Sequence, residues 1–317
     1  MKFLILGAGG VGGYFGGRLA ASGADVTFLV REQRAQQLKR DGLVIESALN
    51  QPPGTLKLPV KYVIAADLKP GYECVILTCK AYDLDTAMDA IAPAMNDNCA
   101  VLPLLNGIGH LERLDARFGR GRVLGGTCHL AITLSPEGVI RHLNDFDRIM
   151  VGERDKTLTP RIQAISAALE KSGVETKLSE DIELEMWEKI AFLSTLAGMT
   201  SLMRASIGEI AATPDGAALV RRYYQACIEI ATQCGHAPRA HVVQRMLDVL
   251  TERGSKLTAS MLRDLESGGR VEADHIVGFM LGKARQMQVD DSLLSVAYAH
   301  LKAYENRRVA KRLLGAL

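Results

Sequence analysis

The feature that most restricts the fold is a glycine-rich hexapeptide, Gly-Ala-Gly-Gly-Val-Gly, close to the N-terminus. It occupies residues 7–12, directly after the apolar residues 3–6 and before a helical pattern that reaches about Ser22. A GxGxxG turn between a strand and a helix is the context in which this motif indicates a dinucleotide site. Gly7 is expected to form the tight turn, Gly9 to admit a pyrophosphate and Gly12 to let helix and strand pack closely.

The helix that follows the turn supplies free N–H groups and a positive dipole for phosphate. The alternative is a glycine turn that binds nothing, and the flanking strand and helix weigh against it. The residues expected to contact the cofactor are Gly7, Ala8, Gly9, Gly10, Val11 and Gly12.

Short apolar runs recur through the first half of the chain, at residues 26–30, 74–77 and 101–105, with helical patterns between them. Strands that are apolar throughout are covered on both faces, as in a parallel sheet. The alternation predicts an α/β fold, a Rossmann-type doubly wound parallel sheet. Residues 119–178 are expected to form a β-rich extension.

From Ile182 onward the strand signals disappear and amphipathic helical patterns fill the chain. The predicted division is therefore 1–181 for the dinucleotide-binding domain and 182–317 for a helical substrate and dimerisation domain. Long amphipathic helices also suggest a homodimer. Helices are expected at residues 182–199, 215–234, 241–253, 272–286 and 293–313.

Composition narrows the functional classes. The net charge is +2, from 38 Lys+Arg against 36 Asp+Glu, which disfavours a general nucleic-acid binder. The six cysteines show no CxxC spacing, so we expect reduced core residues and no metal site. No apolar run is long enough for a membrane span and no signal peptide is recognisable, so a cytoplasmic location is expected.

Arg31 stands at the end of the second predicted strand, where NAD-specific folds usually carry an acid. A guanidinium there, with Arg34 one helical turn later, can pair with a 2′-phosphate and favours NADPH. Glu32 is the competing signal, and a solvated helix start is the alternative for Arg31. Lys80 and Asn106 follow two other strands, where ligands bind in open α/β sheets, although either could be an ordinary turn residue.

Lys189 falls inside an apolar stripe of the helix predicted from Ile182, so it either snorkels to water or performs chemistry. Its place at the predicted domain junction favours chemistry. Glu272 begins a predicted helix, where the dipole alone would favour an acid. Asp264 and Glu266 are nearby acids with the same ambiguity, and Ser260 is either a helix residue or an anion contact. Spacing alone does not choose among these four residues.

In its ordered motifs the chain resembles the ketopantoate reductase (2-dehydropantoate 2-reductase) family of pantothenate biosynthesis. The resemblance implies NADPH-dependent reduction of a 2-oxo acid, with Lys189 as general acid and Glu272 as its acidic partner. It also implies substrate contacts by Ser260, with Asn106 and Lys80 near cofactor and substrate. The motifs are residues 7–12, Arg31, 79–81, 105–109, 187–189, 260–264, and Glu272 with Asp274 before 278–279.

The chain departs from the family where asparagines are typical, since Leu193, Ala197 and Leu257 occupy those positions. Apolar groups remove hydrogen bonds that a hydroxylated substrate would use, so a 2-oxo acid is expected while ketopantoate itself is in question. The alternatives are another two-domain dehydrogenase of the 3-hydroxyacid, 6-phosphogluconate or opine type, or a non-catalytic NADP(H)-binding sensor.

Overall fold

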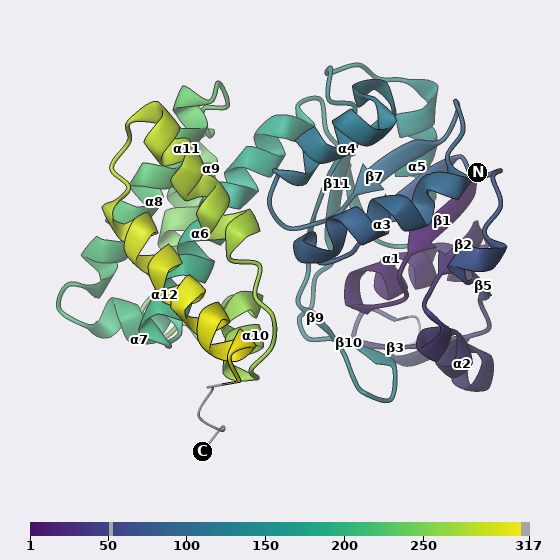
Figure 1. The fold of residues 1–317 in the computed structure, drawn as a ribbon, viewed down its shortest axis with the longest axis horizontal. Helices are drawn as coiled ribbons and strands as arrows, with labels where there is room; N and C mark the ends of the chain where they lie inside the picture. The colour runs from purple at the N-terminus through teal and green to yellow at the C-terminus, as the bar shows by residue number, and fades with distance from the viewer. Residues whose placement is uncertain (51–52, 312–317) are drawn as a thin grey trace. The chain divides into compact units, whose positions relative to one another are not determined.

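The computed structural model describes residues 1–50 and 53–311 (Figure 1). Contacts between residues divide the chain into two compact units. The first comprises Met1–Leu105 and His110–Glu185, and the second joins Asn106–Gly109 to the chain from Met186 onward. The inclusion of the short segment 106–109 with the helical half was not expected from the sequence. The domain boundary between residues 181 and 182 stays a prediction.

The first unit is built on a parallel five-stranded sheet in the order β5-β2-β1-β6-β7. This order places β1 in the centre, with β2 and β5 added on one side and β6 and β7 on the other. Such a change in the direction of strand addition confirms the predicted doubly wound α/β class. The strands are β1 (Lys2–Leu6), β2 (Asp25–Leu29), β5 (Lys61–Val63), β6 (Cys74–Leu77) and β7 (Ala100–Pro103), and the helices beside them are α1 (Gly10–Ala21), α2 (Glu32–Asp41), α3 (Leu84–Ile91) and α4 (His110–Phe118).

Two smaller sheets complete this unit. One has the order β4-β3-β10-β9 and the other β12-β11-β8. The expected β-rich extension also contains the helix α5 (Pro160–Lys171), and strands β3 to β5 were not predicted because they are short or only half-buried. The strands are β3 (Leu43–Ser47), β4 (Gly54–Leu58), β8 (Gly125–His129), β9 (Ile132–Leu134), β10 (Val139–His142), β11 (Arg148–Gly152) and β12 (Glu175–Leu178).

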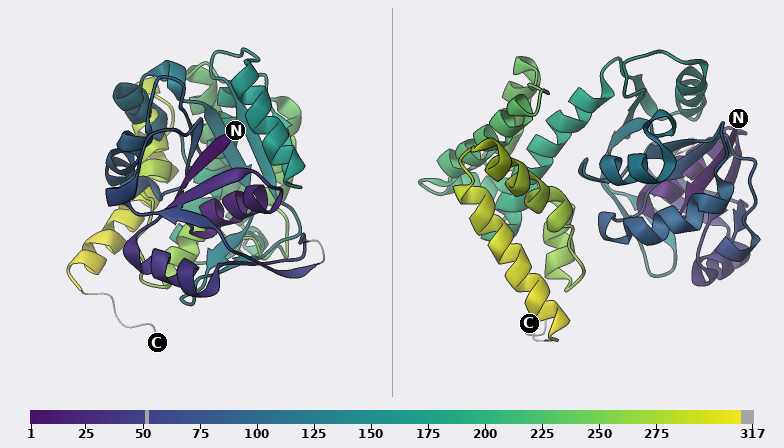
Figure 2. Two further views of the ribbon diagram at one scale, coloured as in Figure 1. Left: turned by 90° about the vertical axis from the view of Figure 1, so that its right-hand side faces the viewer. Right: turned by 45° about the horizontal axis from the view of Figure 1, so that its top comes forward.

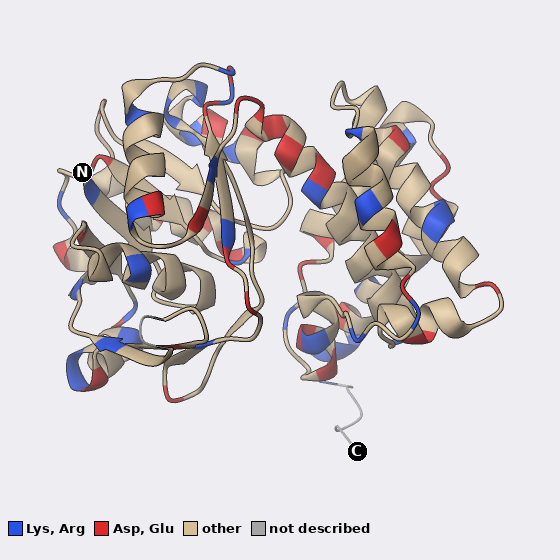
Figure 3. Cartoon of the chain, turned by 180° about the vertical axis from the view of Figure 1, so that it is seen from behind, with Lys and Arg blue, Asp and Glu red and all other residues tan. Residues whose placement is uncertain are grey.

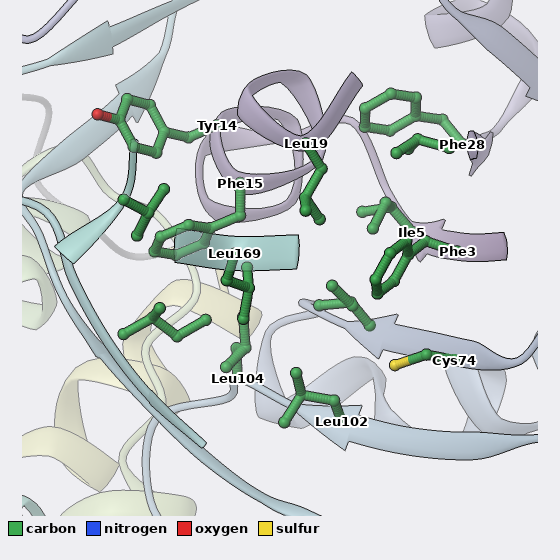
Figure 4. Close-up of a cluster of buried hydrophobic side chains, with 14 of the residues drawn as sticks. Phe3, Ile5, Tyr14, Phe15, Leu19, Phe28, Cys74, Leu102, Leu104 and Leu169 are labelled. Atoms are coloured by element: carbon green, nitrogen blue, oxygen red, sulfur yellow. The ribbon is translucent and has the colours of Figure 1, made fainter. Parts of the chain in front are cut away.

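The core of this unit forms where α1 lies against the central sheet (Figure 4). Phe3 and Ile5 of β1, Phe15 of α1 and Phe28 of β2 are fully buried. Gly16 sits so close to the sheet that an added Cβ would lie 2.7 Å from the Phe28 ring and 2.9 Å from Ile5. The glycine content of α1 therefore sets how closely this helix packs on the strands.

The second unit is formed by helices and connecting loops in the described part of the chain (Figure 2). Residues 274–278 form a π-helical turn, η5 (Asp274–Gly278), that continues into α11 (Phe279–Met287). The helices are α6 (Ile182–Met203), whose first residues belong to the first unit, α7 (Ile207–Ala212), α8 (Gly216–Gln233), α9 (Ala240–Leu250), α10 (Ser260–Glu266) and α12 (Ser292–Val309).

Several predicted features of this half need correction. Glu272 does not begin a helix, because helical structure starts at Asp274. The second half of α6 is buried on every side rather than along one stripe, since Ser194, Met199 and Ser201 are all fully buried. The short helices α7 and α10 were not predicted. The expected end of the last helix at Leu313 lies outside the described residues.

Figure 3 shows acidic and basic residues on both units. Among the residues that the structure describes, no helix is both long enough and apolar enough to span a membrane. All six cysteines lie within the described residues and form no disulfide, and four of them are buried.

The packing of α1 generates a first prediction. Gly16→Ala should lower the free energy of unfolding by about 1–3 kcal/mol, because its methyl group would overpack Phe28 and Ile5. Gly282→Ala is the control in α11, where an added Cβ would meet nothing within 4 Å. That variant should gain roughly 1 kcal/mol of helix propensity. Thermal and urea unfolding measure both, and a Gly16→Ala protein as stable as wild type would contradict the packing argument.

Candidate active site

The glycine turn has the geometry that the motif requires. Gly7 has a φ angle of +88°, and its N–H donates to the Leu29 carbonyl at 2.9 Å. Gly9 caps α1, and an added Cβ there would meet nothing within 4 Å. A Cβ on Gly12 would instead collide with the Gly7 carbonyl oxygen and the Thr78 hydroxyl. The turn thus leaves open space beside Gly9, where a phosphate could approach, and close packing at Gly12.

A cavity of about 690 Å³ opens beside this turn, within the first unit. Alanines from three segments give it an apolar wall, and polar side chains of α2 lie on its lining as well. Its volume lies in the usual range for small-molecule and cofactor sites. The lining includes Gly7, Ala8, Gly9, Val30, Arg31, Gln33, Arg34, Gln37, Ala65, Thr78, Cys79, Asp83, Ala87, Ala90, Ser135 and Pro136.

Two arginines of this lining differ in their surroundings. Arg31 caps the start of α2, and its side chain is 87% exposed, with Nη2 at 4.0 Å from an Asp83 carboxylate oxygen. Arg34 is half-buried and donates from Nε to the Ala8 carbonyl at 2.9 Å and from Nη1 to the Gly138 carbonyl at 3.0 Å. Sequence reasoning noticed Arg34 only as a second cation. Its place three residues after Arg31, in the first turn of the helix that Arg31 caps, is the signal that could have linked the two side chains.

The two strand-end residues belong to different units. Lys80 directly precedes the short 3₁₀ helix η2 (Ala81–Asp83), in the same unit as the glycine turn. Asn106 belongs to the second unit, and Gly107 after it has a φ angle of +86°. The structure therefore groups Asn106 with the helical half.

Three segments of the second unit meet around the ring of Phe279. The Trp187 and Phe279 ring centroids are 6.0 Å apart. An added Cβ on Gly109 would lie 3.1 Å from the Phe279 ring, and one on Gly107 would lie 2.7 Å from the His275 carbonyl oxygen. These contacts connect the segments that carry the predicted residues Lys189, Asn106 and Glu272, which are far apart in the sequence.

Glu272 is only 4% exposed. Its carbonyl accepts a hydrogen bond from the N–H of Ile276 at 3.2 Å, at the entry to the π-helical turn. Helix-dipole stabilisation explains an exposed acid in a first turn, but it does not explain why a carboxyl group is buried. π-Helical turns occur frequently at functional sites. Both observations favour a functional role for this carboxylate.

Lys189 is half-buried on α6, and its two preceding residues are held firmly. The Trp187 ring stacks on His236 with centroids 5.5 Å apart. Glu188 is 5% exposed and accepts from the backbone N–H of Arg239 at 2.9 Å and from its Nε at 2.8 Å. Sequence reasoning missed this ion pair, in which Glu188 is buried and Arg239 is half-buried, and which fixes the loop before α9 against α6. Its local signal was an acidic residue, Glu188, directly before Lys189, whereas Arg239 lies far along the chain.

Ser260 is half-buried at the first position of α10. The N–H of the preceding Ala259 donates to the Thr200 hydroxyl of α6 at 3.5 Å, which ties the start of α10 to α6. The residues at the positions of the expected asparagines are apolar and covered to different degrees. Ala197 is fully buried, whereas Leu193 and Leu257 are half-buried.

Comparison with known families identifies the family of the chain. Residues 3–156 match the family model described as Ketopantoate reductase PanE/ApbA, and residues 181–305 match its C-terminal model. The chain belongs to the ketopantoate reductase family. This membership confirms the predicted enzyme class, an oxidoreductase acting on a CH–OH group with a nicotinamide cofactor.

Relatives match over nearly the whole length. The uncharacterized oxidoreductase YkpB of Bacillus subtilis is 35% identical over 305 residues, covering 96% of this chain and 99% of that protein. A 2-dehydropantoate 2-reductase of Nostoc sp. is 28% identical, with 96% of each chain covered. The crystal structure of 2-dehydropantoate 2-reductase from Geobacter metallireducens superposes with a TM-score of 0.86 at 26% identity, covering 96% of this chain and 99% of that one.

The loop at Asn106 generates a second prediction. Gly107→Ala should destabilise the helical unit of this ketopantoate reductase family member, because its Cβ would lie 2.7 Å from the His275 carbonyl. Gly235→Ala is a matched control, with the same φ of +86° and nothing within 4 Å of an added Cβ. Thermal unfolding should show a larger loss for Gly107→Ala, by about 1–3 kcal/mol. Equal losses in the two variants would contradict the contact.

Proposed function

We propose that the protein reduces a 2-oxo acid to a 2-hydroxy acid with NADPH, using Lys189 as the general acid. The observation that carries this proposal is the meeting of three segments at Phe279. It gathers the chain around Lys189, Asn106 and Glu272 within one unit. Ordinary turn and helix-start roles do not require such a meeting of distant segments.

The first unit offers what a dinucleotide needs. The glycine turn presents backbone N–H groups and the positive end of α1 to a pyrophosphate. The exposed guanidinium of Arg31 at the end of β2 would pair with a 2′-phosphate, which favours NADPH over NADH. When bound, the reduced cofactor supplies a hydride to the substrate carbonyl carbon.

Lys189 would donate a proton to the carbonyl oxygen as negative charge develops on it. A cation within hydrogen-bond reach of that oxygen stabilises the developing alkoxide. A carboxylate partner favours the protonated form of a lysine, so Glu272 would keep this ammonium charged and orient it. The burial of Glu272 supports this role, because a buried carboxylate needs a charged or hydrogen-bonding partner.

The remaining predicted residues would recognise the substrate. Ser260 would contact its carboxylate, and Asn106 and Lys80 would lie near substrate and cofactor. Apolar Leu193 and Ala197 stand where amides would serve a hydroxyl group. We therefore propose that the pocket favours a 2-oxo acid without that hydroxyl, so that a role in pantothenate biosynthesis depends on the activity measured with ketopantoate.

The catalytic role predicts the behaviour of Lys189→Ala. A positioned acid contributes about 10²–10⁴-fold in rate, so kcat should fall by that range while the Kd for NADPH changes little. Lys256→Ala, on the loop before α10, is an exposed lysine control that should retain full activity. Stopped-flow rates with a saturating 2-oxo acid and fluorescence titration of NADPH measure the two quantities. Unchanged turnover in Lys189→Ala would remove the proposed mechanism, and a wild type that binds NADPH but turns over no oxo acid would favour a sensor.

The substrate proposal predicts that wild type prefers trimethylpyruvate, the 4-deoxy analogue of ketopantoate, over ketopantoate itself. Wild type should have the higher kcat/KM for trimethylpyruvate, because the apolar residues offer no partner to the hydroxyl. Leu193→Asn should move the ratio at least about tenfold toward ketopantoate, because a site with a hydroxyl partner discriminates strongly. Wild type that prefers ketopantoate, with a ratio unmoved in Leu193→Asn, would contradict this assignment.

Association into a homodimer, expected from the amphipathic helices, stays a prediction. The cytoplasmic location, expected from the lack of a recognisable signal peptide and of a long apolar run, also stays a prediction. Light scattering of the full chain tests the homodimer, and a monomeric mass would contradict it.

A further inference from the structure

We propose that Arg34 is a positioning residue for the dinucleotide, cross-linking the glycine turn to the turn between β9 and β10. This inference rests on the cofactor assignment of the proposed function. It differs from a phosphate contact, because a cross-link that holds the cavity serves NADPH and NADH equally.

The cross-link is made by two edges of one planar group. Nε of Arg34 donates to the carbonyl of Ala8, inside the glycine turn, at 2.9 Å. Nη1 donates to the carbonyl of Gly138, in the β9–β10 turn, at 3.0 Å. The two acceptors are 130 positions apart in the sequence, so no local structure holds them together. A rigid guanidinium can satisfy two such acceptors at once, whereas a single ammonium group cannot span them equally.

The β9–β10 turn is itself part of the cavity. Leu134, Ser135 and Pro136 line it together with the glycine turn. Gln37, three residues after Arg34 on α2, donates from Nε2 to the Pro136 carbonyl at 3.1 Å and accepts from Arg34 Nη1 at 3.0 Å. Arg34 and Gln37 of α2 therefore hydrogen-bond to two carbonyls of this turn.

The backbone at Gly138 has a conformation and surroundings that a residue with a side chain would not tolerate. Its φ angle is +92°, and a Cβ there would collide with Arg34 Nη1 and lie 3.0 Å from Gln37 Oε1. The space that a side chain would fill is thus occupied by the guanidinium. A glycine at position 138 is therefore what allows the Arg34 guanidinium to lie against this turn.

Arg31 lines the same cavity but differs from Arg34 in its exposure to solvent. Its side chain is 87% exposed and its nearest ion-pair partner is 4.0 Å away, so it is accessible to a phosphate. Nε and Nη1 of Arg34 already donate to protein acceptors, and Nη2 is buried from solvent with no hydrogen-bond partner among the described residues. Two of the three guanidinium nitrogens of Arg34 are therefore engaged by the protein, which favours a positioning role.

Direct binding tests this without any oxo acid. Fluorescence titration gives the Kd values of NADPH and NADH for wild type, Arg34→Lys and Gly138→Ala. Arg34→Lys keeps the charge but loses the two-point geometry, and Gly138→Ala keeps the charge but displaces the guanidinium. Both should raise both Kd values by about tenfold, equivalent to about 1.4 kcal/mol, and leave the NADPH to NADH ratio within about twofold of wild type.

Two controls separate this effect from others. Gly173→Ala carries a similar φ of +81° with nothing within 4 Å of an added Cβ, so it matches the backbone strain of Gly138→Ala without the collision. Its Kd values should equal those of wild type. Arg31→Ala should weaken NADPH alone. All titrations are made well below the unfolding temperature of each variant, so that lost stability does not imitate lost binding.

Two results would overturn the inference. Unchanged Kd values in both Arg34→Lys and Gly138→Ala would show that the cross-link does not serve binding. A loss confined to NADPH in these variants would make Arg34 a phosphate ligand instead. A wild type that binds neither dinucleotide is a distinct outcome, because it removes the proposed function together with this inference.

Discussion

The first unit depends on how closely one helix approaches one sheet. At Gly12 and Gly16 of α1 there is no room for a Cβ, because the Gly7 carbonyl, Thr78 and the Phe28 ring occupy that space. The same approach places the start of α1 at the end of β1, so the close packing that buries Phe3 and Phe15 also shapes the glycine turn that we propose binds phosphate. The packing of the first unit and the shape of the glycine turn thus share one constraint, the absence of side chains on one face of α1.

The second unit depends on an aromatic contact. Phe279 follows the π-helical turn and contacts the segments of Trp187 and Gly109. A π-helical turn shifts the register of a helix, so the residues before it point differently from an ordinary first turn. That shift accompanies the burial of Glu272. Nearby, the Glu188–Arg239 ion pair holds the loop before α9 against α6, so the surroundings of Lys189 are set by tertiary contacts on both sides.

Local patterns predicted the elements whose signals are strong and continuous. The strand, turn and helix of residues 2–21 and the fully apolar strands β6 and β7 could be predicted because each carries its complete signal within a few residues. Strands β3 to β5 could not, because short, half-buried strands have weak periodicity. Likewise, α6 has polar residues such as Ser194 and Ser201 buried by tertiary packing, which a stripe of apolar residues does not foresee.

The sequence by itself determined the glycine turn between a strand and a helix, the alternation of apolar strands with helices in the first half, and the residue types available for chemistry. These follow from glycine stereochemistry and hydrophobic periodicity. Tertiary structure alone decided that Asn106–Gly109 joins the helical unit, that Glu272 is buried, and that Arg34 connects Ala8 to Gly138. The reason is physical: these facts depend on contacts between residues far apart along the chain, and no pattern of neighbouring residues records which distant backbone a side chain will meet.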